Sequence, residues 1–238
     1  MVNLNYDFIE DPDGPKGISI NSWFERKNMA LILVDVQNCI TRKKYSNKWS
    51  SGGNEIYYYN RIDQIIIPNM QRLIKKFREL KIKIIYFRNA SMDQNLSDIS
   101  RLGIKWTLDE LKDIDAVKNI FYYAKDGSFI DERVKPSKED IVLIKNSSGG
   151  FSSTNMEKIM RYNNITRLIF TGGMTDCCLS STFREACDRG YLCTVIEDAC
   201  FTSSHKDHTV AIKNLGKYFG WVTKTNNIIG YLDKVNKF

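Results

Sequence analysis

Residues 168–190, LIFTGGMTDCCLSSTFREACDRG, are the stretch that decides the fold. Its first apolar run is typical of a buried strand. Two glycines with Thr175 and Asp176 then indicate a turn, and apolar residues recur at helical spacing until Gly190. With Asp176 as the helix N-cap, the Cys178 thiol lies in the first turn, where unpaired N–H groups and the helix dipole favour a thiolate. This combination predicts a site for nucleophilic chemistry.

Composition limits the class of protein. The 238 residues can bury one sizeable core, and 42% hydrophobic with 26% charged residues is typical of a soluble globular protein. No apolar run approaches the ~18 residues of a membrane helix, and the acidic, polar N-terminus is not a secretory signal. The lysines behind the net charge of +7 are scattered, which argues against nucleic acid as a partner. We therefore expect a cytoplasmic protein with neither a membrane nor a nucleic-acid partner.

Cysteine and histidine usage bears on cofactors. The six cysteines form no Cys-x2-Cys pair and are expected to be reduced thiols. The only histidines, His205 and His208, stand at the start of a predicted helix and are interpreted as capping or surface residues. The sequence therefore predicts no metal site and no other cofactor.

Six short apolar segments predict the strands of one sheet, at residues 29–36, 82–87, 140–144, 168–170, 192–196 and 221–222. Helical patterns are found after Pro68, over 154–162, from Cys178 and after Ser204, whereas 41–60 is predicted to be loop. Alternating strands and helices predict an α/β fold. We expect a Rossmann-like three-layer sandwich with about six parallel strands and helices on both faces.

The domain organisation is predicted to be simple. Residues 1–28 lack periodicity and are expected to form an N-terminal arm, with 29–238 as a single domain. The segment 88–139 is long and irregular, and such an insertion often covers the active site of an α/β domain. Its aromatic cluster at 121–123 is either part of that cover or, the favoured alternative, a small satellite core.

Three reactive side chains stand at the predicted carboxyl ends of strands. Asp35 is at the end of the first strand, Lys145 follows the third, and Cys178 lies just beyond the fourth. Ligands of parallel sheets bind beyond these ends, near the point where strand order reverses. We therefore expect the three side chains to meet in one crevice.

Three motifs contain these residues, in this order: LVDVQN at 33–38; Lys145 with Phe151 and Thr154; and Gly172-x-x-Thr175-Asp176-x-Cys178 followed by Thr182. Through them the chain resembles the isochorismatase-like cysteine hydrolases. That superfamily includes nicotinamidases, carbamoylsarcosine amidases, biuret hydrolases and ureidoacrylate amidohydrolases. The resemblance covers roughly residues 28–232.

The resemblance implies a catalytic triad of Asp35, Lys145 and Cys178, with Cys177 at a variable position. The Cys178 sulfur would attack an amide or ureido carbonyl, and Asp35 would move the proton. Lys145 would hold the thiolate and the carboxylate by its charge. The resemblance also implies a cis peptide bond between Gly173 and Met174.

An oxyanion hole is implied as well, formed by the N–H groups of Met174 and Cys178. Residues 39–90 contain no histidine, which argues against the metal site of nicotinamidases. The stretches STFREACDRGY at 181–191 and FGWV at 219–222 are most similar to the biuret and ureidoacrylate hydrolases.

The predicted function is hydrolysis of a C–N bond in a small amide, ureido or carbamoyl compound through an acyl-enzyme on Cys178. The resemblance suggests a homodimer or homotetramer.

Other functions remain open at this stage. A nicotinamidase-like hydrolase and a non-enzymatic binding protein on the same fold are the main alternatives. The spacing of Cys178 and Arg184 also matches the Cys-x5-Arg loop of cysteine phosphatases. That loop needs glycine to wrap a phosphate, whereas these five residues have helical spacing, so Arg184 is expected to face away from the thiol. The loop NSSGGF at 146–151 departs from the commoner Ser-Ala-Phe pattern.

Overall fold

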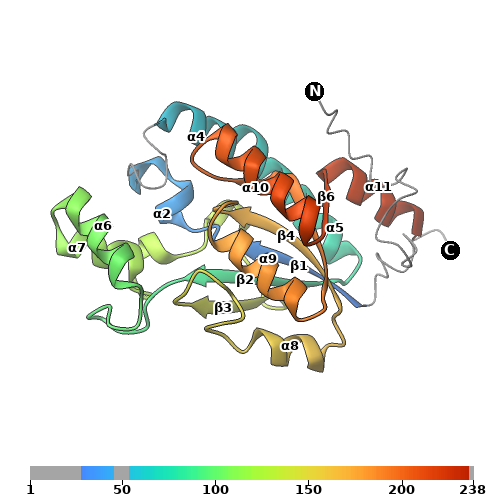
Figure 1. Cartoon of the computed structure of the whole chain (residues 1–238), viewed down its shortest axis with the longest axis horizontal. Coiled ribbons are helices and arrows are strands. Elements are labelled where there is room, and N and C mark those ends of the chain that lie inside the picture. The colour runs from blue at the N-terminus through green and yellow to red at the C-terminus, as the bar shows by residue number, and fades with distance from the viewer. Residues whose placement is uncertain (1–27, 46–53, 236–238) are drawn as a thin grey trace.

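The computed structural model describes residues 28–45 and 54–235 (Figure 1). Its strands are β1 (Met29–Val34), β2 (Lys83–Asn89), β3 (Ile141–Lys145), β4 (Arg167–Gly173), β5 (Leu192–Phe201) and β6 (Trp221–Thr223). All pair in parallel, in the order β3-β2-β1-β4-β5-β6. The predicted six-stranded parallel sheet is confirmed. The arm predicted for 1–28 lies outside the described residues, apart from Asn28.

The central strand explains why this sequence forms a buried parallel sheet. β1 has the sequence MALILV, and every one of its side chains is buried. Ile32 lies opposite Ile85 of β2 on one side and Phe170 of β4 on the other. Such an unbroken apolar run is needed where helices cover both faces. Because the strand order reverses between β1 and β4, a crevice for ligands is expected beyond their carboxyl ends.

Helices cover both faces of the sheet (Figure 1). The described α-helices are α2 (Asn38–Thr41), α4 (Glu55–Arg61), α5 (Ile67–Glu79), α6 (Arg101–Leu111), α7 (Ile114–Phe121), α8 (Met156–Tyr162), α9 (Cys178–Asp188), α10 (His205–Tyr218) and α11 (Thr225–Val235). Apolar residues of α4, α5 and α11 form one core with the sheet, and those of α8, α9 and α10 form the other. The three-layer sandwich is thus confirmed. Among the described residues, no helix has the length and apolar composition needed to cross a membrane.

Two segments are more helical than predicted. The stretch 41–60, expected to be loop, contains α4, which continues through a π-helical turn at Ile62–Ile66 into α5. The wide π turn shifts the helical phase, so no single 3.6-residue period extends across this region of the sequence. The prediction of loop is therefore wrong over residues 55–60. The helix α11 was not predicted at all.

The segment 88–139 forms a satellite unit. Its helices α6 and α7 pack around the buried residues Leu96, Ile99 and Val117, with Phe121 and Tyr122 against them. Phe121 and Tyr122 thus pack in a satellite core, as the favoured interpretation of the aromatic cluster predicts, although Phe121 also packs against the main core. Figure 1 shows α6 and α7 at one end of the molecule, apart from the helices that cover the sheet.

Candidate active site

Asp35 occupies a strained position directly after β1. Its φ of 49° lies in the left-handed region, which a non-glycine residue adopts uncommonly. Its N–H donates to the carbonyl of Phe87 at 3.1 Å, and its side chain is 1% exposed. Within the described residues, its Oδ1 atom has no hydrogen-bond partner. A buried carboxylate with a vacant acceptor is suited to accept a proton.

Lys145 is the last residue of β3 and is fully buried. Its Nζ lies 2.9 Å from Oδ2 of Asp35 and donates to the carbonyl of Ser147 at 2.8 Å. Burial alone would lower the pKa of Lys145, but the Asp35 carboxylate and the Cys178 sulfur raise the pKa above its ordinary value. Lys145 is therefore an ammonium ion at neutral pH.

Cys178 begins α9 and is 7% exposed. The charges of Lys145 and Asp35 both act on its sulfur. Three side chains from distant parts of the sequence therefore meet at the carboxyl edge of the sheet, where β1 and β4 are neighbours. This arrangement combines a thiol, a carboxylate and an ammonium group.

The residue that caps the N-terminus of α9 is not the predicted one. The N-cap is Cys177, without a side-chain hydrogen bond, so the assignment of Asp176 is wrong. The Asp176 carboxylate instead accepts from Oγ1 of Thr202 at 2.5 Å. At Gly172, φ is 106° and a Cβ would lie 2.2 Å from the Val34 carbonyl oxygen, so only glycine lets β4 continue into this turn.

The N–H groups predicted to form an oxyanion hole belong to the same turn. The peptide bond between Gly173 and Met174 is cis. The Met174 carbonyl accepts from the N–H groups of Cys177 and Leu179, which ties the turn to the start of α9. Among the described residues, no backbone carbonyl accepts from the N–H groups of Met174 or Cys178. Within the described chain, both groups therefore lack a backbone acceptor.

The neighbouring cysteines share a hydrogen bond that separates their pKa values. Donation from Cys178 lowers the pKa of Cys177 to about 6, with smaller contributions from Ser148 and Lys145. The pKa of Cys178 is raised by the same hydrogen bond, by burial and by the Asp35 carboxylate. The positive charge of Lys145 lowers this pKa but does not offset the three causes that raise it. These directions are opposite to the resting thiolate expected on Cys178, because the pKa of Cys177 is lowered and that of Cys178 is raised.

Alkylation can test this order. Iodoacetamide is expected to modify Cys177 fastest, because the thiolate is the nucleophile. Since its pKa is lowered, the reactive form is present above pH 6 and is lost as the pH falls through about 6. Peptide mapping by mass spectrometry from about pH 5 to about pH 9 would measure the rates. The internal controls Cys39, Cys193 and Cys200 are buried, with raised pKa values. Faster labelling of Cys178 with a midpoint below 7 would contradict this order.

The loop after β3 is fastened to α9. Oγ1 of Thr182 accepts from the Gly150 N–H at 3.1 Å and donates to the Cys178 carbonyl at 2.8 Å. The Glu185 carboxylate accepts from the Phe151 N–H at 2.9 Å. These bonds fix the strand that carries the lysine relative to the helix that carries the cysteine.

The glycine pair in this loop has a steric cause. A Cβ on Gly149 would lie 2.3 Å from the Glu185 carboxyl group, and one on Gly150 would lie 2.5 Å from the Phe87 ring. A larger residue at position 149 would displace the Glu185 carboxyl group of α9, and one at position 150 would push the loop away from Phe87 of β2. The two glycines that distinguish this loop, NSSGGF at 146–151, from the commoner Ser-Ala-Phe pattern therefore lie where the loop packs closely against its neighbours.

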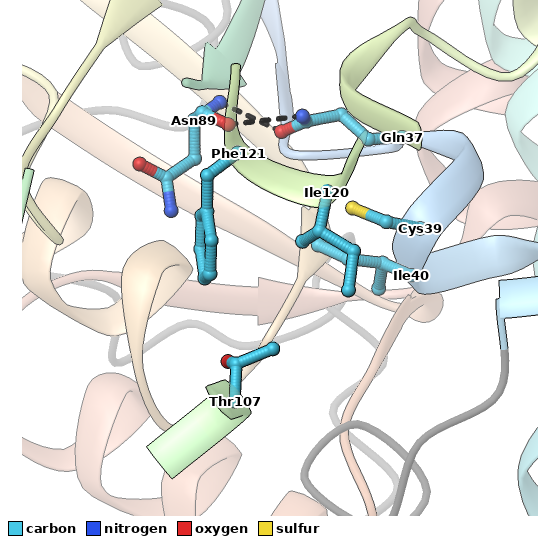
Figure 2. Close-up of a pocket in the computed structure, with 7 residues that line it drawn as sticks. All are labelled: Gln37, Cys39, Ile40, Asn89, Thr107, Ile120 and Phe121. Carbon is cyan, nitrogen blue, oxygen red and sulfur yellow. Dashed lines mark hydrogen bonds between the residues drawn. The ribbon is translucent and has the colours of Figure 1, made fainter. Parts of the chain in front are cut away.

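A small cavity of about 20 Å³ lies at the same end of the sheet. Its walls come from Gln37, Cys39, Ile40, Asn89, Thr107, Ile120 and Phe121 (Figure 2). The Gln37 amide is fully used, since Oε1 accepts from the Asn89 N–H at 2.7 Å and Nε2 donates to the carbonyls of Asn89 and Ser128 at 3.0 and 2.9 Å. Figure 2 shows the Asn89 side chain turned away from Gln37, and its buried Oδ1 has no partner in the described part of the chain. Asn89 lies opposite Lys145 in the sheet register, and sequence analysis missed it.

Two further predictions concern residues outside the triad. Arg184 stacks on the Phe219 ring at 4.2 Å and donates to Ser180 at 3.2 Å, both away from the thiol, so the phosphatase-like arrangement is absent here.

His208 is buried, and its interpretation as a capping or surface residue is wrong, whereas His205 is exposed. In residues 28–45 and 54–235, no group of three or more His, Cys, Asp or Glu side chains could hold a metal.

Comparison with known proteins agrees with this architecture. A family model described as the isochorismatase domain matches residues 29–227. The ureidoacrylate amidohydrolase RutB of Yersinia enterocolitica is 30% identical over 209 residues, covering 84% of this chain and 87% of that protein. The RutB of Acinetobacter baylyi is 26% identical over 208 residues, with coverage of 84% and 82%.

Solved structures show the same fold. A cysteine hydrolase from Pseudomonas syringae superposes with a TM-score of 0.73 at 20% identity, over 88% of this chain and 94% of that chain. The N-carbamoylsarcosine amidase from Thermoplasma acidophilum gives a TM-score of 0.63 at 20% identity, over 84% and 97%. The family model spans most of the chain and ends within α11. This protein therefore belongs to the isochorismatase domain family.

Proposed function

We propose that this protein is a cysteine-dependent amidohydrolase that cleaves a C–N bond, other than a peptide bond, in a small ureido or carbamoyl compound. The observation that carries the proposal is the buried contact of 2.9 Å between Lys145 and Asp35 beside the Cys178 sulfur. A buried ion pair is expensive to desolvate, and its position at the ligand-binding edge of a parallel sheet favours a catalytic role.

The proposed reaction begins with a proton transfer. As the Cys178 sulfur attacks the substrate carbonyl, Asp35 takes the thiol proton, which fits a cysteine whose pKa is raised. The adjacent ammonium of Lys145 favours the negative charge as it passes from the carboxylate to the sulfur. The N–H groups of Met174 and Cys178 would stabilise the oxyanion of the tetrahedral intermediate.

Collapse of this intermediate breaks the C–N bond. Asp35 gives its proton to the departing nitrogen, which leaves as ammonia or an amine, and a thioester remains on Cys178. Water then attacks the thioester while Asp35 again accepts a proton. Release of the acid and return of the proton to the sulfur restore the resting protein.

The substrate class rests on two supports. RutB is a ureidoacrylate amidohydrolase and the Thermoplasma protein is an N-carbamoylsarcosine amidase, so related proteins act on ureido or carbamoyl compounds. In this chain, the unpartnered Oδ1 of Asn89 provides an acceptor for the N–H groups that such substrates present. Thr107, Ile120 and Phe121 bring α6 and α7 to the same cavity.

A substrate panel tests the proposal. The purified chain is expected to release ammonia from ureidoacrylate, biuret or an N-carbamoyl amino acid, and to leave nicotinamide unchanged. An enzyme-coupled ammonia assay would measure each rate, with the Cys178→Ala chain as the blank. Hydrolysis of nicotinamide alone would move the protein to the nicotinamidase alternative. No release from any compound would contradict the amidohydrolase assignment.

A further inference from the structure

His208 is a buried titratable residue that the proposed reaction does not use. It lies in the first turn of α10 and is 6% exposed. A buried imidazole needs partners for both ring nitrogens. Its Nδ1 lies 3.1 Å from Oγ1 of Thr175, and its Nε2 lies 3.4 Å from Nη2 of Arg61 in α4. It therefore connects two helices to the turn that precedes Cys178.

The Arg61 contact selects one tautomer of the ring. A guanidinium group only donates hydrogen bonds, so Nε2 of His208 must accept from Arg61. The proton of the neutral ring then lies on Nδ1, which donates to the Thr175 hydroxyl. The direction of both hydrogen bonds follows from the chemistry of Arg61.

The surroundings of His208 keep the ring neutral. Burial, the charge of Arg61 and the neighbouring His205 lower the pKa of His208 to about 4, and the backbone carbonyl of Glu197 in β5 opposes them only weakly. At neutral pH the ring therefore has one donor and one acceptor, as the two contacts require.

Thr175 transmits this contact to the reactive turn. Its side chain is completely buried, and its N–H donates to the Phe201 carbonyl at 2.8 Å, so backbone and hydroxyl are each held from a different element. Thr175 directly follows Met174, whose carbonyl accepts from the N–H of Leu179 in α9. A displacement of Thr175 would therefore move both proposed oxyanion donors, Met174 and Cys178.

We propose that His208 is a positioning residue, whose Nδ1–H, oriented by Arg61, fixes the Thr175 hydroxyl and thereby the turn that carries the Met174 N–H and Cys178. This inference rests on the proposed amidohydrolase function, because the turn matters most if it holds a nucleophile and an oxyanion. Its effect is on the geometry of the turn and not on proton transfer.

Steady-state kinetics of matched variants test the role. His208→Leu removes the donor, and a small misplacement of reacting groups is expected to lower kcat about 10- to 100-fold with KM within about threefold. His208→Asn places an amide N–H near the position of Nδ1 and is expected to keep at least about a third of kcat. The control His205→Leu changes an exposed histidine of the same helix and should have no effect. Equal losses in His208→Asn and His208→Leu would overturn the proposal.

A substitution at Thr175 tests the same hydrogen bond from its other partner. Thr175→Val keeps the shape but removes the hydroxyl, and should lower kcat as His208→Leu does. Because both changes break one hydrogen bond, the double variant should be about as slow as either single variant. If the factors by which the two single variants lower kcat multiplied in the double variant, the residues would act separately, and the proposal would be overturned.

Histidine NMR separates this inference from the proposed function. The chain has only two histidines, so long-range proton–nitrogen spectra can be assigned by comparison with His208→Asn. The Nδ1–H tautomer is expected for His208, with a midpoint near pH 4. An Nε2–H tautomer or an ordinary midpoint of about 6.5 would overturn the contact. The expected spectrum in a chain that hydrolyses nothing would instead overturn the hydrolase, and with it the positioning role.

Discussion

Replacing Cys178 by alanine is expected to abolish turnover, with a fall in kcat of about 10⁴-fold or more, because Cys178 is the proposed site of the acyl-enzyme. The fold should survive, since the change removes one small atom from the first turn of α9. Ammonia release and the thermal unfolding midpoint, measured on the same preparation, would test both statements.

Cys177→Ala is the matched control, because it removes the adjacent sulfur of the same turn. It also removes the hydrogen bond that raises the pKa of Cys178, so the remaining thiol should ionise more easily. Turnover should therefore persist in Cys177→Ala. An active Cys178→Ala chain beside an inactive Cys177→Ala chain would transfer the nucleophile to Cys177.

The parts of the fold that could be predicted well are those in which burial requires a simple pattern of apolar residues in the sequence. An apolar run such as that of β1 is compatible with few environments, and alternation with helices then implies the parallel sheet. The positions of Asp35 and Lys145 followed from the same logic, because carboxyl ends of parallel strands share one edge. Local pattern failed over residues 55–60, because α4 runs into a π turn at Ile62–Ile66 that changes the helical phase.

Properties that depend on contacts between segments could not be predicted. The spacing around His208, in the sequence SHKDH, is that of an exposed first turn, and only packing against Arg61 and Thr175 buries it. The pKa order of Cys177 and Cys178 likewise depends on which sulfur is covered and which donates. Asn89 carries no motif of its own, and its vacant acceptor is visible only beside the cavity.

Lys145→Met is expected to damage both stability and activity. It leaves the Asp35 carboxylate buried without its partner, which should lower the free energy of unfolding by on the order of 3–5 kcal/mol. It also removes the positive charge beside the Cys178 sulfur, so kcat should fall at least about 10³-fold. Urea denaturation and ammonia release would measure the two effects.

The double variant Asp35→Asn/Lys145→Met separates these effects. Asparagine tolerates the left-handed backbone at position 35 and carries no charge, so no buried ion is left unpaired. Stability should return to within about 1.5 kcal/mol of the unaltered chain, while activity stays absent because the proton acceptor is gone. Lys44→Met, which breaks a salt bridge to Asp126 whose side chains are 64% and 52% exposed, should leave the free energy of unfolding nearly unchanged. If Lys145→Met were as mild as Lys44→Met, the buried pair would not be the electrostatic centre of the site, and the hydrolytic mechanism would lose its main support.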